Sequence, residues 1–250
     1  MPNKARRLLA RALTGMIRRA LLVLCVMHAG QGVANTIVDA WYESVTPRYP
    51  HGVLGDALEY ETLVLTLGSG ETVAVTLPDS AVFEDTAPRL VDLDNDGHPE
   101  VVTVESHQQF GARLAIYGAG GRITAIPYIR TRFRWLAPVG AADLDGDGVI
   151  EIAYVDRPHL AKILRIWRFE RGVLTEIAAF EGVSNHKIGE TDIAGGIRIC
   201  DTTPEMVLAS ENWRSLLALR FDGAEITARK IGTETSRASF ARSMACQDPS

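Results

Sequence analysis

Two nine-residue segments carry acidic residues at alternate positions, then a glycine and a further acid. In the first segment the acids are Asp92, Asp94, Asp96 and Glu100. The second segment has the same order 51 residues later, and its acids are Asp143, Asp145, Asp147 and Glu151. Carboxylates at positions 1, 3 and 5 converge when the chain curls, and a glycine at position 6 permits the sharp turn. Ca²⁺ prefers a shell of about six to eight oxygen ligands, so both segments are predicted calcium loops.

The seventh residue of each segment, His98 or Val149, would add its backbone carbonyl to this shell. An EF-hand loop is excluded, because its twelfth position needs a glutamate and these segments have Thr103 and Tyr154 there. The alternative is a pair of solvated acidic turns that hold no metal. Two copies in the same register favour the metal.

The hydrophobic pattern contains four apolar hairpins, each enclosing a glycine-bearing turn. They start 51, 50 and 53 residues apart, at Leu63, Leu114, Leu164 and Leu217. Alternation has a period of two residues, and helical periodicity is absent beyond the N-terminal segment. A single β-sandwich would not repeat so regularly. The predicted fold is all-β: a small β-propeller, or a propeller-like array of about four units, each of roughly 50 residues and four strands.

The segments DLDNDGHPE and DLDGDGVIE, each running into an apolar strand and a hairpin, resemble FG-GAP/VCBS repeats, the calcium-loop repeats of integrin-type β-propellers. The stretch from Ala137 to Asp143 is similar to the lead-in of that repeat. The resemblance covers about residues 88 to 225 and implies that the eight acids of the two segments are calcium ligands. In the next repeat, the segment Ile199 to Glu205 lacks the acidic cage, and no metal is predicted there.

A second recurring feature follows the first strand of three units, where an acid stands two or three residues before a ring side chain. The residues are Glu105 with His107, Asp156 with His159, and Glu211 with Trp213. They form a candidate ligand site at one mouth of the ring, although ordinary polar turns are the alternative. The segments around His51 and His186 also combine histidine with acids, and we interpret them as loop filling. No zinc spacing and no nucleophile elbow occurs in the chain.

The first 34 residues have the order of a secretory signal peptide, with six basic residues and no acid, an apolar run of about ten residues, and Gly32-Val33-Ala34. We therefore predict a signal peptide over residues 1–34 and one domain over residues 35–250. The expected location is the periplasm or the exterior, with no stable membrane anchor after cleavage. An apolar run of this length is too short to span a bilayer.

Cleavage would leave 20 basic and 31 acidic residues, a net charge of −11. An acidic surface disfavours nucleic acid as the partner. Cys200 and Cys246 are predicted to form a disulfide in an oxidising compartment, with two free thiols as the alternative.

The leading functional hypothesis is a non-enzymatic, calcium-stabilised module that binds a protein or a glycan. The alternative is a hydrolase or lyase that uses the carboxylates at the mouth of the ring.

Overall fold

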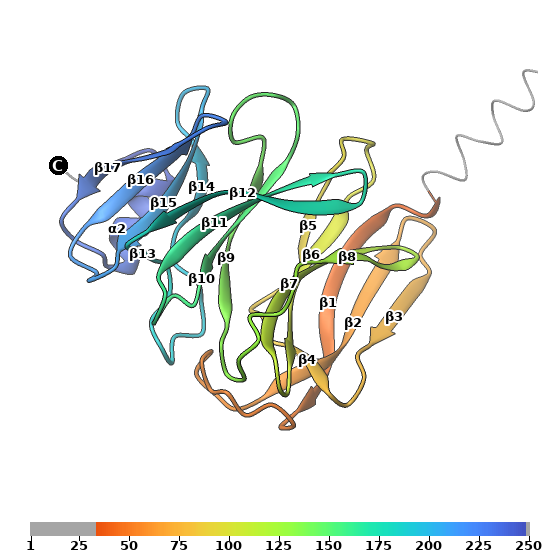
Figure 1. Cartoon of the computed structure of the whole chain (residues 1–250). Coiled ribbons are helices and arrows are strands. Elements are labelled where there is room, and N and C mark those ends of the chain that lie inside the picture. The colour runs from red at the N-terminus through yellow and green to blue at the C-terminus, as the bar shows by residue number, and fades with distance from the viewer. Residues whose placement is uncertain (1–33, 249–250) are drawn as a thin grey trace, which may run out of the picture.

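The computed structural model describes residues 34–248. The signal-peptide prediction falls almost entirely on residues 1–33, outside the described residues. The described chain is nearly all β, in three antiparallel sheets that form four successive units (Figure 1). No helix in this part of the chain has the length and apolar character needed to cross a membrane.

Unit 1 consists of β1 (Ile37–Thr46), β2 (Glu59–Leu67) and β3 (Thr72–Thr76). Unit 2 consists of β4 (Ala81–Phe83), β5 (Arg89–Val91), β6 (Glu100–His107), β7 (Gly111–Gly118) and β8 (Gly121–Ala125). Strand β4 pairs with both β2 and β6, so units 1 and 2 share one eight-stranded sheet.

Unit 3 is a four-stranded sheet of β9 (Leu136–Ala142), β10 (Glu151–Asp156), β11 (Ile163–Glu170) and β12 (Val173–Glu181). Unit 4 consists of β13 (Val183–Ser184), β14 (Gly196–Ile199), β15 (Pro204–Ser210), β16 (Leu216–Phe221) and β17 (Ile226–Gly232). The four predicted hairpins are the pairs β2–β3, β7–β8, β11–β12 and β16–β17. The repeat prediction is confirmed. Only unit 3 is a simple four-stranded sheet, because β4 joins two units and β13 is added to the last.

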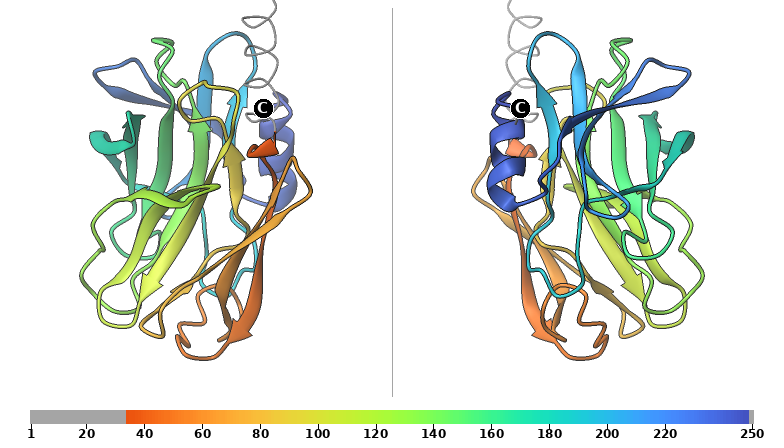
Figure 2. Two further views of the ribbon diagram at one scale, coloured as in Figure 1. Left: turned by 90° about the vertical axis from the view of Figure 1, so that its right-hand side faces the viewer. Right: turned by 90° about the vertical axis from the view of Figure 1, so that its left-hand side faces the viewer.

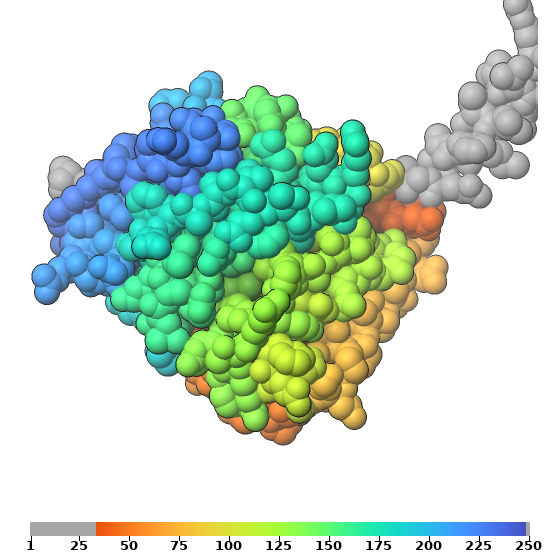
Figure 3. Space-filling view, in the orientation of Figure 1, coloured from red at the N-terminus to blue at the C-terminus, as the bar shows by residue number. Residues whose placement is uncertain are grey.

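Units follow one another in chain order, and unit 1 and unit 4 lie at opposite ends of the array (Figure 1). Among the described residues no strand of unit 1 pairs with a strand of unit 4, so the sheets do not close into a barrel. On the face shown in Figure 3, the units form adjoining bands of surface in chain order.

The core lies between successive sheets, since alternate residues of each inner strand face opposite neighbours. In β6, Val101 packs with Leu63 and Phe83 of the preceding sheet region, whereas Val102 packs with Ile152 of unit 3. A further cluster joins units 3 and 4. Inner strands are therefore buried on both faces, which explains their nearly continuous apolar sequence.

The outer face of unit 4 is covered by helix α2 (Arg237–Met244) rather than by another sheet (Figure 2). Ser236 caps this helix by accepting a hydrogen bond from the Ser239 N–H. Phe240, 3% exposed, packs on Val207 and Leu216. The disulfide predicted between Cys200 and Cys246 is present, with 5.4 Å between the Cα atoms, and it ties the end of the helix to unit 4.

Candidate metal centre and ligand pocket

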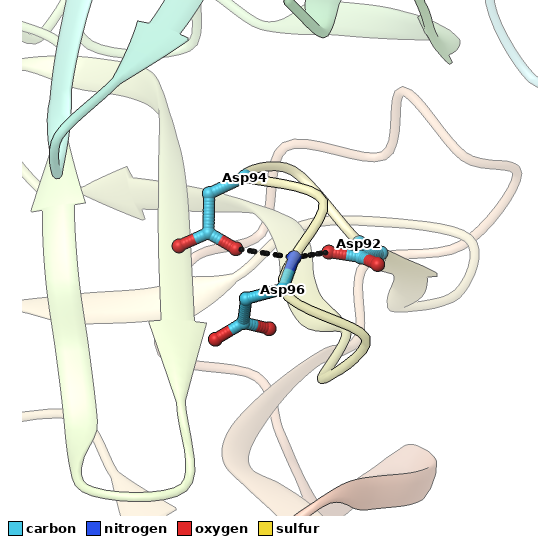
Figure 4. Close-up of side chains that lie close together, drawn as sticks. All are labelled: Asp92, Asp94 and Asp96. Atoms are coloured by element: carbon cyan, nitrogen blue, oxygen red, sulfur yellow. Dashed lines mark hydrogen bonds between the residues drawn. The ribbon is translucent and has the colours of Figure 1, made fainter.

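The first acidic loop joins β5 to β6 and is folded by hydrogen bonds from its own backbone. Asp92 accepts from the N–H groups of Asp96 at 3.1 Å and Gly97 at 2.9 Å. Asp96 accepts from the His98 N–H at 2.7 Å. One carboxylate oxygen from each of Asp92, Asp94 and Asp96 lies within 4.8 Å of the others (Figure 4). A carboxylate has about four lone-pair sites, so these oxygens that accept hydrogen bonds still have lone pairs for a cation.

The second loop, between β9 and β10, repeats this backbone pattern. Asp143 accepts from Gly146 at 2.7 Å and Gly148 at 3.0 Å. Oxygens of Asp143, Asp145 and Glu151 lie within 4.8 Å of one another. The side-chain amide of Asn95 donates to the Gly148 carbonyl at 3.0 Å, so the two loops are neighbours.

The acid at the ninth position of each loop is buried at the start of the following strand. Glu100 accepts from the Leu93 N–H and Glu151 from the Leu144 N–H, each at 2.9 Å. Burial raises the pKa of both carboxyls above the ordinary value, and for Glu100 the charges of Asp94 and Asp96 add to the effect.

Both donor sets fit Ca²⁺, because every candidate side-chain ligand is a carboxylate oxygen, and in the first loop the crowded acids repel one another without a cation. Calcium would supply the missing positive charge. His98 and Val149 follow the loop glycines as expected, and their carbonyls remain predicted ligands.

The corresponding segment of unit 4 keeps a buried acid, Glu205, which is instead bound by arginines. Burial acts to raise its pKa, but hydrogen bonds from Arg198, Arg229 and Arg220 outweigh this and hold it below the ordinary value.

The predicted mouth residues of unit 2 are engaged within their own unit. Glu105 is fully buried and accepts from Arg113 at 2.5 Å and from Tyr117 at 2.5 Å. His107 stacks on Phe110, with 4.7 Å between the ring centroids.

In unit 3, Asp156 is bound by Arg157 at 2.8 Å and by Arg165 at 3.0 Å. Its predicted companion, His159, instead contacts His186. In unit 4, Glu211 is exposed, and Trp213 packs on Phe240. No hydrogen bond or ion pair within residues 34–248 links the predicted set of one unit to that of another.

A cavity of about 330 Å³ does lie at the predicted end of the array. Strand β9 begins at Leu136, next to the lining residue Trp135, and ends at Ala142, next to the second acidic loop, so the pocket and this loop lie at opposite ends of the unit 3 sheet. The residues that line the cavity come from four loops. They are His51, Val53, Phe133, Arg134, Trp135, Arg157, His159, Leu160 and Ile188. Of the six predicted mouth residues, only His159 is among them.

His51 is fixed in the pocket wall by a buried acid. Its Nδ1 lies 2.5 Å from Oε1 of Glu84, whose side chain is fully buried. The other carboxylate oxygen accepts from the Ser106 hydroxyl. Burial raises the pKa of Glu84, while the hydrogen bond and charge of His51 oppose this rise. With Nδ1 facing Glu84, the Nε2 atom of His51 is left for a ligand.

The second imidazole of the wall belongs to a histidine pair. His186 Nε2 lies 2.9 Å from the Glu190 carbonyl, to which it must donate, because a carbonyl only accepts. His186 Nδ1 therefore accepts from His159 Nε2, at 3.0 Å. Burial lowers the pKa of His159 to about 4 and also lowers that of His186, so both rings are neutral near pH 7.

Two large residues of the lining have left-handed backbone conformations, Phe133 at φ 55° and Arg157 at φ 44°. Such conformations are costly for side chains of this size and gather at functional sites. Phe133 stacks on His51, with 5.2 Å between the ring centroids. Tyr49 supports this turn by accepting from the Phe133 N–H at 2.9 Å.

Loop filling is therefore an incomplete interpretation of His51 and His186, since His51 lines the cavity and His186 orients His159. Glu84, Phe133, Trp135 and Arg157 were missed by sequence reasoning. The available signal was the arginine- and aromatic-rich connection Arg130-Thr-Arg-Phe-Arg-Trp135 between β8 and β9.

Residues 67–154 match the family described as the FG-GAP-like repeat. The matched segment includes both acidic loops and the strands that follow them. None of the curated proteins compared with the chain matches it. Residues 67–154 are therefore an FG-GAP-like repeat segment, and the described chain has a β-propeller-like fold.

Proposed function

We propose that this protein is an exported, calcium-stabilised binding module, and that its ligand enters the pocket lined by His51, Phe133, Arg134 and His159. One observation supports the binding role. Four loops converge on one cavity, and hydrogen bonds orient His51 and His159 on two of its sides. Cavities of this size that combine apolar walls with a few fixed polar groups are typical of ligand sites.

Export is supported by the N-terminal pattern and by the Cys200–Cys246 disulfide, since disulfides persist in oxidising compartments. Calcium binding is supported by the oxygen donors gathered in the first loop. Calcium would hold together the end of the array that lies opposite the pocket. Its role in this proposal is to stabilise the fold.

The ligand chemistry follows from the charges of the wall. Among the described residues, Arg134 and Arg157 line the cavity and no acid does. Arg157 is already paired with Asp156, whereas the hydrogen bond of Arg134 goes to the neutral carbonyl of Phe133. The group that fits is a carboxylate on a small apolar body, carried by a glycan or a protein partner.

A carboxylate-dependent hydrolase or lyase is the second candidate function. It is favoured by the His51–Glu84 pair, which has the arrangement of a base and its orienting acid. The part of the cavity lining that the structure describes, however, contains no aspartate or glutamate, and so no pair of carboxylates to flank a glycosidic bond.

Saturation-transfer NMR tests the binding role with glucuronate and N-acetyl-aspartate, using glucose and N-acetyl-asparagine as neutral counterparts. We expect transfer to the two acids, loss of transfer in Arg134→Gln, and retention in Arg171→Gln, which removes a charge from the turn at the far end of unit 3. Equal transfer to acids and neutral counterparts, or none to either acid, would contradict the proposed ligand class.

A further inference from the structure

Units 2, 3 and 4 share a buried acid at the start of the strand that follows the loop position, namely β6, β10 and β15. Glu100, Glu151 and Glu205 are 8%, 0% and 2% exposed. A buried carboxylate requires a positive partner or several hydrogen bonds. What differs among the three units is the residue that stands opposite this acid on the next strand.

The strand registers identify these opposite residues. Val101 pairs with Tyr117, so Glu100 stands opposite Gly118. Glu151 pairs directly with Arg168. Met206 pairs with Leu219, so Glu205 stands opposite Arg220. The same structural position therefore holds a glycine in unit 2 and an arginine in units 3 and 4.

Arg168 reaches from this position into the second acidic loop. Its Nε donates to Glu151 Oε1 at 2.8 Å, and its Nη2 donates to Asp145 Oδ2 at 2.8 Å. Its Nη1 lies 2.9 Å from Asp147 Oδ2. The guanidinium thus contacts the acids at positions 3, 5 and 9, which are three of the four predicted carboxylate ligands of that loop.

In unit 4 the shared buried acid is contacted by the largest number of arginines. Its loop lacks the acidic cage, and Glu205 is contacted by Arg198 at 2.8 Å, Arg220 at 2.8 Å and Arg229 at 2.9 Å. The first loop is the opposite case, because Gly118 has no side chain and the hydrogen bond to Glu100 comes from the backbone of Leu93. From unit 2 to unit 4, arginine side chains on the shared acid increase from none to one to three.

We propose that the guanidinium of Arg168 is a built-in cation of the second loop, so that the two loops, although alike in sequence, bind calcium unequally. The first loop is the calcium site of the native protein. The second loop takes calcium only when Arg168 swings out. This inference rests on the proposed calcium binding and specifies which loop performs it.

The inequality has a simple physical origin. Calcium entering the second loop must break three charge-assisted contacts of Arg168 and leave the guanidinium beside a divalent cation. Loss of even one hydrogen bond to a charged group lowers an affinity by about tenfold. We therefore expect calcium at the second loop to bind at least about tenfold more weakly than at the first.

Calorimetric titration of chelator-stripped protein with CaCl₂ tests the proposal on the full chain. The main variant is Arg168→Gln, which shortens the side chain and removes its charge. Arg165→Gln is the matched control, because it lies on the same strand and carries the same charge but pairs with Asp156 and Glu176. Gly118→Arg is the reciprocal variant. Its backbone accepts a side chain, and the nearest atom to an added Cβ is the end of the Ile123 side chain at 3.1 Å.

We expect one tight site in the native protein and in Arg165→Gln, two tight sites in Arg168→Gln, and a first loop weakened at least about tenfold in Gly118→Arg. Two equally tight sites in the native protein, unchanged in Arg168→Gln, would overturn the role of Arg168 and leave calcium binding intact. Absence of calcium binding in the native protein and in Arg168→Gln would overturn both proposals. Circular dichroism of each variant in chelator establishes that it is folded.

Discussion

Cys246, just beyond helix α2, is bonded to Cys200, just beyond β14, so the helix is held against the outer face of unit 4 at its C-terminal end. The buried side of this helix includes Phe240, Ser239 and Ser243. Arg198 adds a second link by donating to the Ser243 carbonyl at 2.7 Å. The last unit of the array is thus closed by a helix in place of a further sheet.

Removal of this disulfide should destabilise the protein substantially. The bond closes a loop with a sequence separation of 46 residues, for which chain entropy predicts a contribution of about 4 kcal/mol. The double variant Cys200→Ser, Cys246→Ser should lose about 2–4 kcal/mol of unfolding free energy in urea titrations. Dithiothreitol should reproduce the loss in the native protein and leave the double variant unchanged.

Sequence reasoning found the acidic loops because all their carboxylates lie within nine residues of one another. Asp92 and Glu100 meet through local turns and one strand start, and such spacing is visible in the sequence. Arg168 could not be found this way, because its contact with Asp145 depends on the register of two strands and on a separation of 23 residues. The pocket is harder still to predict from the sequence, because its lining residues come from four different loops.

The fold was predictable because each hairpin repeats at nearly constant spacing and turns on glycine. Of the six candidate mouth residues, only His159 lines the cavity. Glu105 was predicted to follow a strand, but it lies within β6, where Arg113 and Tyr117 of the neighbouring strand bind its carboxylate.

Glu59 should make the protein less stable as the pH rises. It is 2% exposed, and burial together with the charges of Glu84, Asp56 and Asp85 raises its pKa well above the unfolded value of 4.5. A folded-state pKa above the unfolded one contributes stability below pH 4.5 that is lost as the pH increases. Glu59→Gln should therefore be more stable than the native protein at pH 8 by about 1–3 kcal/mol, with a smaller difference at pH 5.

Urea unfolding at both pH values in saturating calcium measures this effect, because calcium keeps the loop acids from contributing to it. Glu71→Gln, in the exposed β2–β3 turn, is the control. A Glu59→Gln variant that is equally destabilised at both pH values would contradict the explanation.

His159 should titrate with a pKa of about 4, since burial and the neighbouring His186 and His51 disfavour its charged form. Its folded-state pKa is below the unfolded value of 6.5, so the stability it contributes is present above pH 6.5 and is lost as the pH falls toward 4. NMR titration of the imidazole resonances measures the midpoint directly. A midpoint at 6.5 or above would mean that the His159–His186 pair is not formed as described.

Export predicts a new N-terminus. Protein isolated from the cell envelope or the medium should begin at Asn35 or within a few residues of it, because Gly32-Val33-Ala34 supplies small residues for signal peptidase. Replacing Ala34 with a bulky residue, as in Ala34→Phe, should cause the precursor to accumulate. N-terminal sequencing that reads from Met1 or Pro2 in extracellular material would refute cleavage.

Thermal unfolding in calcium and in chelator tests most directly the proposal that calcium stabilises the array. At free calcium of about 100 times the dissociation constant, one site adds roughly 2.7 kcal/mol. That corresponds to a rise in Tm of about 5–11 °C for a domain of this size. The native protein should show this rise, and Asp92→Asn with Asp94→Asn in the first loop should abolish most of it. Identical melting curves in calcium and in chelator for the native protein would contradict the account.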